Sequence, residues 1–270
     1  MRITEIYRSI QGDTQYAGLP CTLVRTTGCD LRCGYCDSAF AFHGGTDMSV
    51  AQILDEVDRL AAPLVLLTGG EPMLQREIGA LAVALLGRGY RVMIETSGSQ
   101  PLDSLPAGVA RIVDVKTPGS GESARMRWSV LDGLGAGDAV KFVLCDEADY
   151  RWAAGVILER RLSERTEVLL SPEHGRLDPR DLVTWMLRDG LRARLGRPDV
   201  LVQLKVEARP EPVPQHPRHQ LSGVEAPVLG RKQDLRPFGE APLLDDLRGP
   251  AVVGLVAQHE LDRVPRPQGV

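Results

Sequence analysis

Residues 21–36 read CTLVRTTGCDLRCGYC, a β-branched and aliphatic run that leads directly into three cysteines, Cys29, Cys33 and Cys36. The run predicts a short strand over residues 22–25. Three thiols within eight residues, in a chain whose five cysteines make an odd number, favour metal ligation over a disulfide framework. The chemistry of this protein is therefore predicted to begin where this strand ends.

Strands and helices alternate along most of the chain. Further strands are predicted from their aliphatic and β-branched content, at residues 64–67, 91–95, 111–115, 140–144, 167–170 and 200–206. The alternation predicts a parallel sheet covered by helices, either an open doubly wound sheet or a full or partial (β/α) barrel. In both, functional residues belong at the carboxyl ends of the strands. The conspicuous motifs follow predicted strands in this way, at residues 26–37, 68–72, 95–98 and 116–121.

Three helices carry start or stop patterns. Ser49 and Gln52 form the pattern of a capping box at the start of the first. Apolar residues repeat at helical spacing over residues 78–86, and glycines end that helix. Asp178 and Pro179 begin the third, since aspartate is a favoured N-cap and proline suits the first helical position. Each helix falls between predicted strands, as a parallel sheet requires.

The composition excludes several functional classes. The chain of 270 residues and 29.4 kDa is 43% hydrophobic and 25% charged, which suits a globular protein with a real core. A net charge of −4 and a pI near 5.8 disfavour binding to nucleic acid or a membrane surface through a basic field. No apolar run approaches the roughly 18 residues of a membrane span, and the N-terminus has no signal-peptide pattern. We therefore expect a cytoplasmic protein with neither nucleic acid nor membrane as a partner.

The last stretch of the chain differs in composition from the rest. Ten of the 19 prolines fall in residues 209–270, and Phe238 is the only aromatic residue there. Its apolar residues follow neither the helix period nor the strand period over a useful length. We predict a core domain over residues 1–206 and an irregular, proline-rich tail over residues 207–270 that is disordered or loosely packed.

The spacing Cys29-x3-Cys33-x2-Cys36 indicates the kind of metal centre. Structural zinc sites have four ligands, often in two separated pairs, and no fourth ligand is near these three thiols in the sequence. Three thiolates can hold three irons of a [4Fe–4S] cluster and leave the fourth iron open, whereas electron-transfer clusters have four cysteines. An open iron implies a further ligand. A partial zinc site is the structural alternative.

A second motif, Thr68-Gly69-Gly70-Glu71-Pro72, follows the strand at residues 64–67. Its glycines allow the backbone to approach a ligand closely, and Glu71 offers an anion to an ammonium group. The cysteine spacing, Tyr35 before the last cysteine and this motif together resemble the radical S-adenosylmethionine superfamily. The resemblance implies that S-adenosylmethionine binds the open iron and that the glycine motif bonds its amino group. It also implies a partial (β/α)6-type TIM-like barrel.

Further segments resemble one family within it, the 7-carboxy-7-deazaguanine synthases. These segments are residues 9–13 (SIQGD), Arg25, and residues 36–38 (CDS), 95–98 (ETSG), 114–118 (DVKTP) and 141–144 (KFVL), and the resemblance covers about residues 1–205. It implies a lyase that converts 6-carboxy-5,6,7,8-tetrahydropterin to 7-carboxy-7-deazaguanine with loss of ammonia, in queuosine and 7-deazapurine biosynthesis. The implied cofactors are a [4Fe–4S] cluster, S-adenosyl-L-methionine used catalytically, and Mg²⁺. The implied partners are the pterin, a one-electron reductant of the flavodoxin or ferredoxin type, and a second copy of the chain in a homodimer.

The resemblance assigns roles to individual residues. The cluster ligands are Cys29, Cys33 and Cys36. The S-adenosylmethionine contacts are Tyr35, Cys36, Asp37, Gly70, Asp114, Val115, Lys116 and Ser171. The substrate contacts are Ile10, Gln11, Gly12, Arg25 and Thr68, and Arg25 suits bidentate pairing with the substrate carboxylate. Ser38 would ligate Mg²⁺ where the family commonly has threonine, since serine supplies the same hard oxygen. No side chain is expected to act as a catalytic acid or base, because the radical is generated at the cluster.

Two departures from the family pattern concern the substrate end of the site. Asp13 stands where the family commonly has glutamate, which shortens the side chain by one methylene. The strand at residues 200–206 lacks the histidine that the family has there, and it continues into the tail. A reading-frame change near Leu204 and a genuine appended segment are both consistent with the tail. Either alters the end of the chain that closes over the substrate in the family.

Two other functions are compatible with parts of the pattern. Another radical S-adenosylmethionine enzyme, such as a glycyl-radical activase, shares the cysteine spacing and the glycine motif. It needs neither Arg25 nor the Gln11-Gly12 and Asp37-Ser38 pairs. A non-catalytic metal protein would use the cysteines structurally and hold zinc without S-adenosylmethionine.

Overall fold

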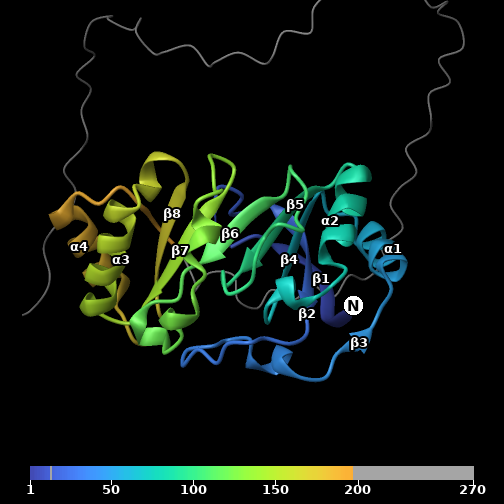
Figure 1. The fold of residues 1–270 in the computed structure, drawn as a ribbon, viewed down its shortest axis with the longest axis horizontal. Coiled ribbons are helices and arrows are strands. Elements are labelled where there is room, and N and C mark those ends of the chain that lie inside the picture. Colours follow the sequence, from blue (N-terminus) through green and yellow to red (C-terminus); the bar gives the residue numbers. More distant parts are fainter. Residues whose placement is uncertain (13, 197–270) are drawn as a thin grey trace, which may run out of the picture. The chain divides into compact units, whose positions relative to one another are not determined.

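The computed structural model describes residues 1–12 and 14–196, which form a sheet with helices packed against it (Figure 1). Asp13, the predicted strand at residues 200–206 and the predicted tail at residues 207–270 lie outside the described residues.

The described sheet has nine strands in the spatial order β3-β1-β2-β4-β5-β6-β7-β8-β9. From β2 to β9 neighbouring strands are parallel, whereas β1 is antiparallel to β2 and β3 is antiparallel to β1. The strand bounds are β1 Arg2–Ile10, β2 Pro20–Thr26, β3 Thr46–Asp47, β4 Leu64–Gly69, β5 Arg91–Thr96, β6 Ala110–Asp114, β7 Ala139–Leu144, β8 Glu167–Pro172 and β9 Arg194–Leu195. Within the described residues β3 and β9 form the two edges, so this mostly parallel sheet is a partial barrel, as predicted.

Six strands confirm the sequence prediction, namely β2 and β4 to β8. The sequence patterns miss β1, because charged residues such as Arg2, Glu5 and Arg8 interrupt its apolar residues. Pairing along its length with β2 holds β1 in the sheet. This omission matters for function, because β1 brings a carboxylate to the site.

The α-helices of the described residues are α1 Val50–Leu60, α2 Ile78–Gly87, α3 Glu147–Glu159 and α4 Pro179–Asp189. The capping box of α1 is present, with Ser49 accepting from the Gln52 backbone, and Asp178 caps α4 as predicted. No start or stop pattern in the sequence indicated α3. Short 3-10 turns replace an α-helix between β6 and β7, where the segment is rich in glycine. These turns leave the carboxyl end of β6 free to face the cysteines.

Alternate residues of each parallel strand face opposite sides of the sheet. On β4, Val65 and Leu67 pack in one core with α1 and α2. Leu64 and Leu66 belong to a separate apolar cluster on the other side, here called the inner face. The further members of the inner-face cluster are Cys21, Met93, Ile112, Ala139 and Leu169. A core under α3 and α4 completes the packing.

The inner face becomes polar toward the carboxyl ends of the strands. Two residues beyond an apolar inner-face position, a polar side chain occupies the same side of the strand. The residues that follow this rule, here called the polar layer, are Arg25, Thr68, Glu95, Asp114, Lys141 and Ser171. The strand period thus gathers polar side chains from six strands, four of them charged, at the end of the sheet where the cysteines lie.

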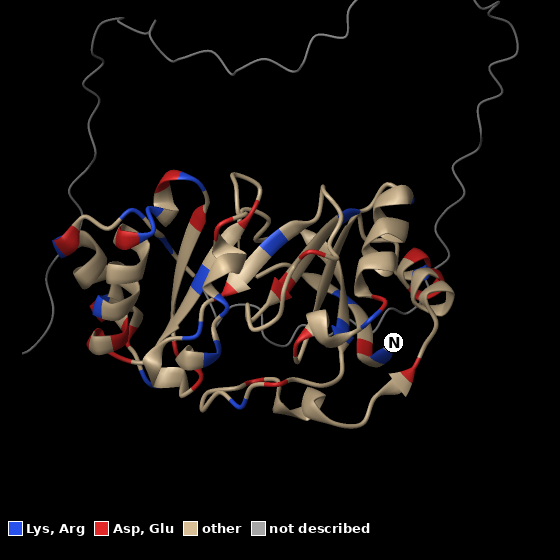
Figure 2. Cartoon of the chain, viewed as in Figure 1, with Lys and Arg blue, Asp and Glu red and all other residues tan. Residues whose placement is uncertain are grey.

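Charged side chains of both signs lie on α1, α3 and α4, whereas α2 carries none (Figure 2). The apolar character of α2 fits its place in the core against α1 and the sheet. In the described part of the chain, no helix is long and apolar enough to cross a membrane.

Candidate active site

The cysteine loop, residues 29–36, leaves the carboxyl end of β2. Cys29, Cys33 and Cys36 are free thiols that are partly exposed, and the buried side chain of Leu31 anchors the loop between the first two. No group of three cysteine, histidine or acidic side chains among the described residues converges on a single metal position. In a [4Fe–4S] cube each thiolate binds a different iron, so the three thiols need not converge on one point.

Two of the three thiols, Cys29 and Cys33, are held in the protonated form in the cluster-free chain. Burial raises the pKa of Cys33 to about 11, although Lys116 opposes the rise. Burial also raises the pKa of Cys29. Only thiolates bind iron, so ligation must displace protons from these side chains.

The glycine motif packs directly against the start of the cysteine loop. The backbone nitrogen of Gly70 donates to the Thr26 carbonyl at 3.2 Å, and that of Glu71 donates to the Gly28 carbonyl at 2.8 Å. A Cβ atom at Gly70 would lie 2.2 Å from the Gly28 carbonyl oxygen and 2.8 Å from Cys29 Cβ. Glycine is therefore required at this position, because any side chain would displace the loop that carries the first cysteine.

The side chain of Glu71 is fully buried and accepts hydrogen bonds at both oxygens. Met73 N and Thr96 Oγ1 donate to Oε1 at 3.0 and 2.8 Å, and Ser97 N and Oγ donate to Oε2 at 2.7 and 2.6 Å. A carboxylate has about four acceptor positions, and these four donors fill them. The expectation that Glu71 offers an anion to an ammonium group is therefore wrong. Its carboxylate fastens the glycine motif to the end of β5.

Asp30 fastens the cysteine loop to the segment that follows β5. Ser99 Oγ donates to one oxygen of Asp30 at 3.1 Å, and Gln100 Nε2 donates to the other at 2.9 Å. Asp30 was not predicted as a site residue, because nothing in the sequence indicates a contact between residues 69 and 70 positions apart.

Arg25 and Ser38, predicted to bind substrate and Mg²⁺, lie together. Arg25 Nε donates to Glu5 Oε1 at 2.9 Å, and Nη1 lies 3.4 Å from Ser38 Oγ. Ser38 Oγ donates in turn to Asp37 Oδ1 at 2.8 Å. Glu5 was missed because β1 was missed.

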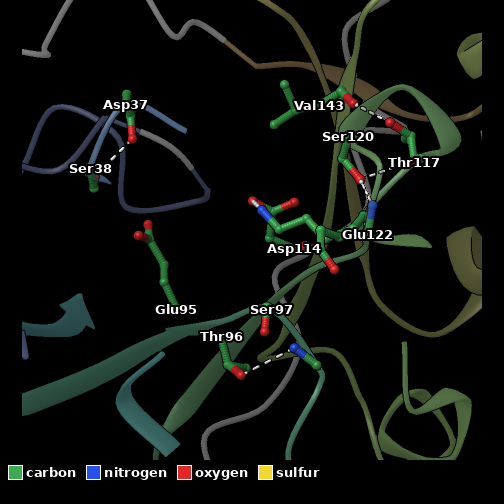
Figure 3. Close-up of polar contacts among 12 residues, drawn as sticks. Asp37, Ser38, Glu95, Thr96, Ser97, Asp114, Thr117, Ser120, Glu122 and Val143 are labelled. Atoms are coloured by element: carbon green, nitrogen blue, oxygen red, sulfur yellow. Dashed lines mark hydrogen bonds and ion pairs between the residues drawn. The ribbon is translucent and has the colours of Figure 1, made fainter. Parts of the chain in front are cut away.

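Thr68 and Glu95 are neighbours in the polar layer. Thr68 Oγ1 donates to Glu95 Oε2 at 3.1 Å. In Figure 3 the Glu95 carboxylate extends from β5 toward the segment of Asp37 and Ser38. Neither Glu95 nor Lys141 was assigned a role from the sequence. The two-residue strand period would have found both, since each follows an apolar inner-face residue by two positions.

The predicted S-adenosylmethionine residues on β6 and β8 offer unused polar atoms. Lys116 Nζ donates to Asp114 Oδ2 at 2.7 Å and lies 5.9 Å from the centre of the Tyr35 ring. Asp114 Oδ1 and Ser171 Oγ are buried with no hydrogen-bond partner in the described structure. Buried polar atoms are normally paired, so these two fit a site that a polar cofactor completes. The Val115 side chain lies in the helix-side core, which leaves its backbone as the group that can face a ligand.

The remaining predicted substrate residues lie toward the opposite end of the sheet. Ile10 pairs with Pro20, five positions before Arg25 on β2, or roughly 16 Å along the strand. Gln11 is buried, and its Nε2 lies 3.9 Å from Met93 Sδ, one inner-face position below Glu95. Gly12 N donates to Gln11 Oε1 at 2.7 Å. Gln11 therefore contacts the inner face on the amino-terminal side of the polar layer. Ile10 lies too far along the sheet to contact Arg25.

The sequence matches the Radical SAM superfamily over residues 23–114. A crystal structure of QueE from Escherichia coli has the same fold, with a TM-score of 0.57 at 20% identity, covering 72% of this chain and 92% of that one. The partial barrel and the three-cysteine loop thus define a radical S-adenosylmethionine protein, a class that implies a [4Fe–4S] cluster and S-adenosylmethionine.

Two curated relatives are named 7-carboxy-7-deazaguanine synthase. The protein from Koribacter versatilis is 46% identical over 211 residues, which cover 73% of this chain and 93% of the relative. The protein from Chlorobaculum tepidum is 37% identical over 198 residues, which cover 72% and 90%. This chain belongs to the 7-carboxy-7-deazaguanine synthase family, a family of radical lyases. The glycyl-radical activase and the non-catalytic metal protein are not favoured.

Proposed function

We propose that this chain converts 6-carboxy-5,6,7,8-tetrahydropterin to 7-carboxy-7-deazaguanine with loss of ammonia, in queuosine and 7-deazapurine biosynthesis. The observation that carries the proposal is the 46% identity to a curated synthase over 93% of that relative's length. The polar layer supports it, because two cations and two carboxylates lie on one side of the sheet at the carboxyl ends of the strands.

The residues of this chain would bind and orient the reactants. Cys29, Cys33 and Cys36 would hold the cluster, which with S-adenosylmethionine supplies one-electron radical chemistry when both are bound. The Asp114–Lys116 pair and the unpaired Ser171 hydroxyl would contact S-adenosylmethionine, with the Gly70 backbone, Tyr35, Asp37 and Val115 beside them. Proximity in a site that excludes competing reactions is then the main contribution of the protein.

Substrate binding would rest on Arg25, whose Nη atoms can pair with the pterin carboxylate while Nε holds Glu5. Thr68, whose hydroxyl is bonded to Glu95, would contact the ring system of the pterin. Gln11 would also contact the ring system, with the backbone of Ile10 and Gly12 next to it. Ser38 would ligate Mg²⁺, since its hydroxyl is a hard oxygen next to the Asp37 carboxylate. Mg²⁺ would neutralise developing charge on the substrate.

The electron donor and the assembly state follow from the family rather than from the contacts. A flavodoxin- or ferredoxin-type protein would supply the electron, and the chain would work as a homodimer in the cytoplasm.

The test is an anaerobic assay of the full chain after cluster reconstitution, with the pterin, S-adenosylmethionine, Mg²⁺ and a reductant. We expect 7-carboxy-7-deazaguanine by absorbance and mass spectrometry, with little net consumption of S-adenosylmethionine. Cys33→Ala should lose both cluster and product. Cys21→Ala, in the apolar inner-face cluster, is the matched control and should retain both. If wild-type protein carries the [4Fe–4S] cluster and cleaves S-adenosylmethionine but forms no product, the substrate assignment is overturned.

A further inference from the structure

The segment that follows β6, residues 117–122, holds the cysteine loop on both sides of Cys33. Gly34 N donates to the Ser120 carbonyl at 3.0 Å. Arg32 N donates to Glu122 Oε1 at 2.7 Å. These two donors are the backbone amides next to Cys33 on either side, so the segment controls the direction in which that thiol points.

The segment is itself tied together (Figure 3). Ser120 Oγ donates to the Thr117 carbonyl at 2.6 Å and accepts from Glu122 N at 3.0 Å. Ser120 and Thr117 are both buried. A displacement at Thr117 would therefore reach both contacts with the cysteine loop.

One carboxylate outside the segment fixes its start. Asp149, in the first turn of α3, is 2% exposed. Its Oδ1 accepts from Gly119 N at 2.8 Å, and its Oδ2 accepts from Thr117 Oγ1 and Cys145 N, each at 3.0 Å. Asp149 thus joins the helix, the end of β7 and the segment after β6 at one point.

Gly119 allows this junction to form. A Cβ atom there would lie 2.3 Å from Asp149 Oδ2 and 2.8 Å from Cys145 Sγ. The segment can approach the carboxylate only without a side chain at this position.

We propose that Asp149 is a positioning residue for the iron–sulfur cluster, acting through the segment 117–122 on the backbone around Cys33. The proposal rests on the role of Cys33 as a cluster ligand, which belongs to the proposed function. Asp149 touches neither cluster nor substrate. Outer-shell partners that orient metal ligands commonly affect metal affinity by about 10–100-fold, and Asp149 occupies such a place.

The test compares Asp149→Asn with Asp146→Asn in the full chain. Asparagine keeps the size of Asp149 but turns an amide donor toward the N–H and O–H donors that the carboxylate now accepts. Asp146 is the exposed N-cap of the same helix, so its variant removes the same charge from the same helix terminus and keeps the cap, without touching the segment. Two properties are measured on reconstituted protein: the rate of iron loss to a chelator, and the electron paramagnetic resonance spectrum of the reduced cluster with and without S-adenosylmethionine.

We expect iron loss from Asp149→Asn to be at least about tenfold faster than from the wild type, with an altered resonance spectrum. Asp146→Asn should match the wild type in both. Equal rates and spectra for the two variants would overturn the proposal. A wild-type chain that assembles no cluster would instead contradict the proposed function.

A second pair of variants keeps the test open if Asp149→Asn does not fold. Glu122→Ala removes the carboxylate that accepts from the Arg32 backbone amide. Gly119→Ala places a methyl group against the Asp149 carboxylate. Both should accelerate iron loss and alter the spectrum. Wild-type behaviour of both variants would also overturn the proposal.

Discussion

Arg25 of β2 and Glu5 of β1 form an ion pair across these two antiparallel strands, with Nε 2.9 Å from Oε1. The strand register places the two residues directly opposite each other, and their side chains are only 14% and 18% exposed. Arg25 Nη2 also lies 3.5 Å from Tyr7 Oη. Each guanidinium nitrogen thus has a protein partner before substrate arrives, namely Glu5 at Nε, Ser38 at Nη1 and Tyr7 at Nη2. This ordering lowers the entropy cost of binding a carboxylate.

Replacing Glu5 with Gln is expected to raise the KM for the pterin about tenfold, with a smaller effect on kcat. A charge-assisted hydrogen bond contributes about 1.5 kcal/mol, and without it Arg25 is less well oriented. Steady-state kinetics of the reconstituted enzyme measure this. Glu56→Gln, which breaks the exposed pair with Arg59 on α1, should leave KM unchanged. Equal KM values for the two variants would show that Glu5 does not orient Arg25.

Replacing Lys116 with Met is expected to destabilise the cluster-free chain. Burial alone would lower the pKa of Lys116, but the neighbouring Asp114 carboxylate raises it above the ordinary value, so the ammonium persists at neutral pH. Removing it leaves the largely buried Asp114 without its cation, at a cost of about 3 kcal/mol in unfolding free energy, the lower end for a buried pair. Urea denaturation measures the change.

The double variant Asp114→Asn with Lys116→Met is the control for charge imbalance. It should recover part of the lost stability, because no unpaired charge remains, yet still bind S-adenosylmethionine more weakly than the wild type. Equal stability of the single and double variants would mean that the pair does not stabilise the fold.

The content of β-branched and aliphatic residues predicted the parallel strands and, with the cysteine spacing, the end of the sheet where chemistry is expected. It failed at β1, where charged residues occupy positions that an ordinary strand fills with apolar ones. One of those charged residues, Glu5, belongs to the site, since it binds Arg25. The role of Glu71 was mistaken for a related reason. A sequence shows a carboxylate but not the donors that saturate it, and here three of the four donors come from Thr96 and Ser97, 25 and 26 positions away.

Replacing Ser97 with Ala distinguishes two roles for Glu71, fastening the glycine motif and binding the ammonium group of S-adenosylmethionine. Ser97 supplies two of the four donors to the Glu71 carboxylate. If Glu71 acts by fastening the glycine motif, loss of the Ser97 hydroxyl loosens the motif and weakens S-adenosylmethionine binding about three- to tenfold, as expected for one hydrogen bond. Calorimetric titration of the reconstituted enzyme measures the affinity. Were Glu71 to bind the ammonium group itself, the same variant would free an acceptor and bind at least as tightly as the wild type.

Replacing Ser38 with Ala and with Thr tests the proposed Mg²⁺ ligand. Alanine removes the hard oxygen, and the Mg²⁺ concentration for half-maximal activity should rise by at least about tenfold, the lower end of the cost of losing even an outer-shell partner. Threonine keeps the hydroxyl and should retain the wild-type Mg²⁺ dependence. The measurement is activity against Mg²⁺ concentration at saturating substrate. Because Arg25 Nη1 lies 3.4 Å from Ser38 Oγ, KM for the pterin is followed in parallel. An unchanged Mg²⁺ dependence in Ser38→Ala, with only KM altered, would place Ser38 in the substrate site and not at the metal.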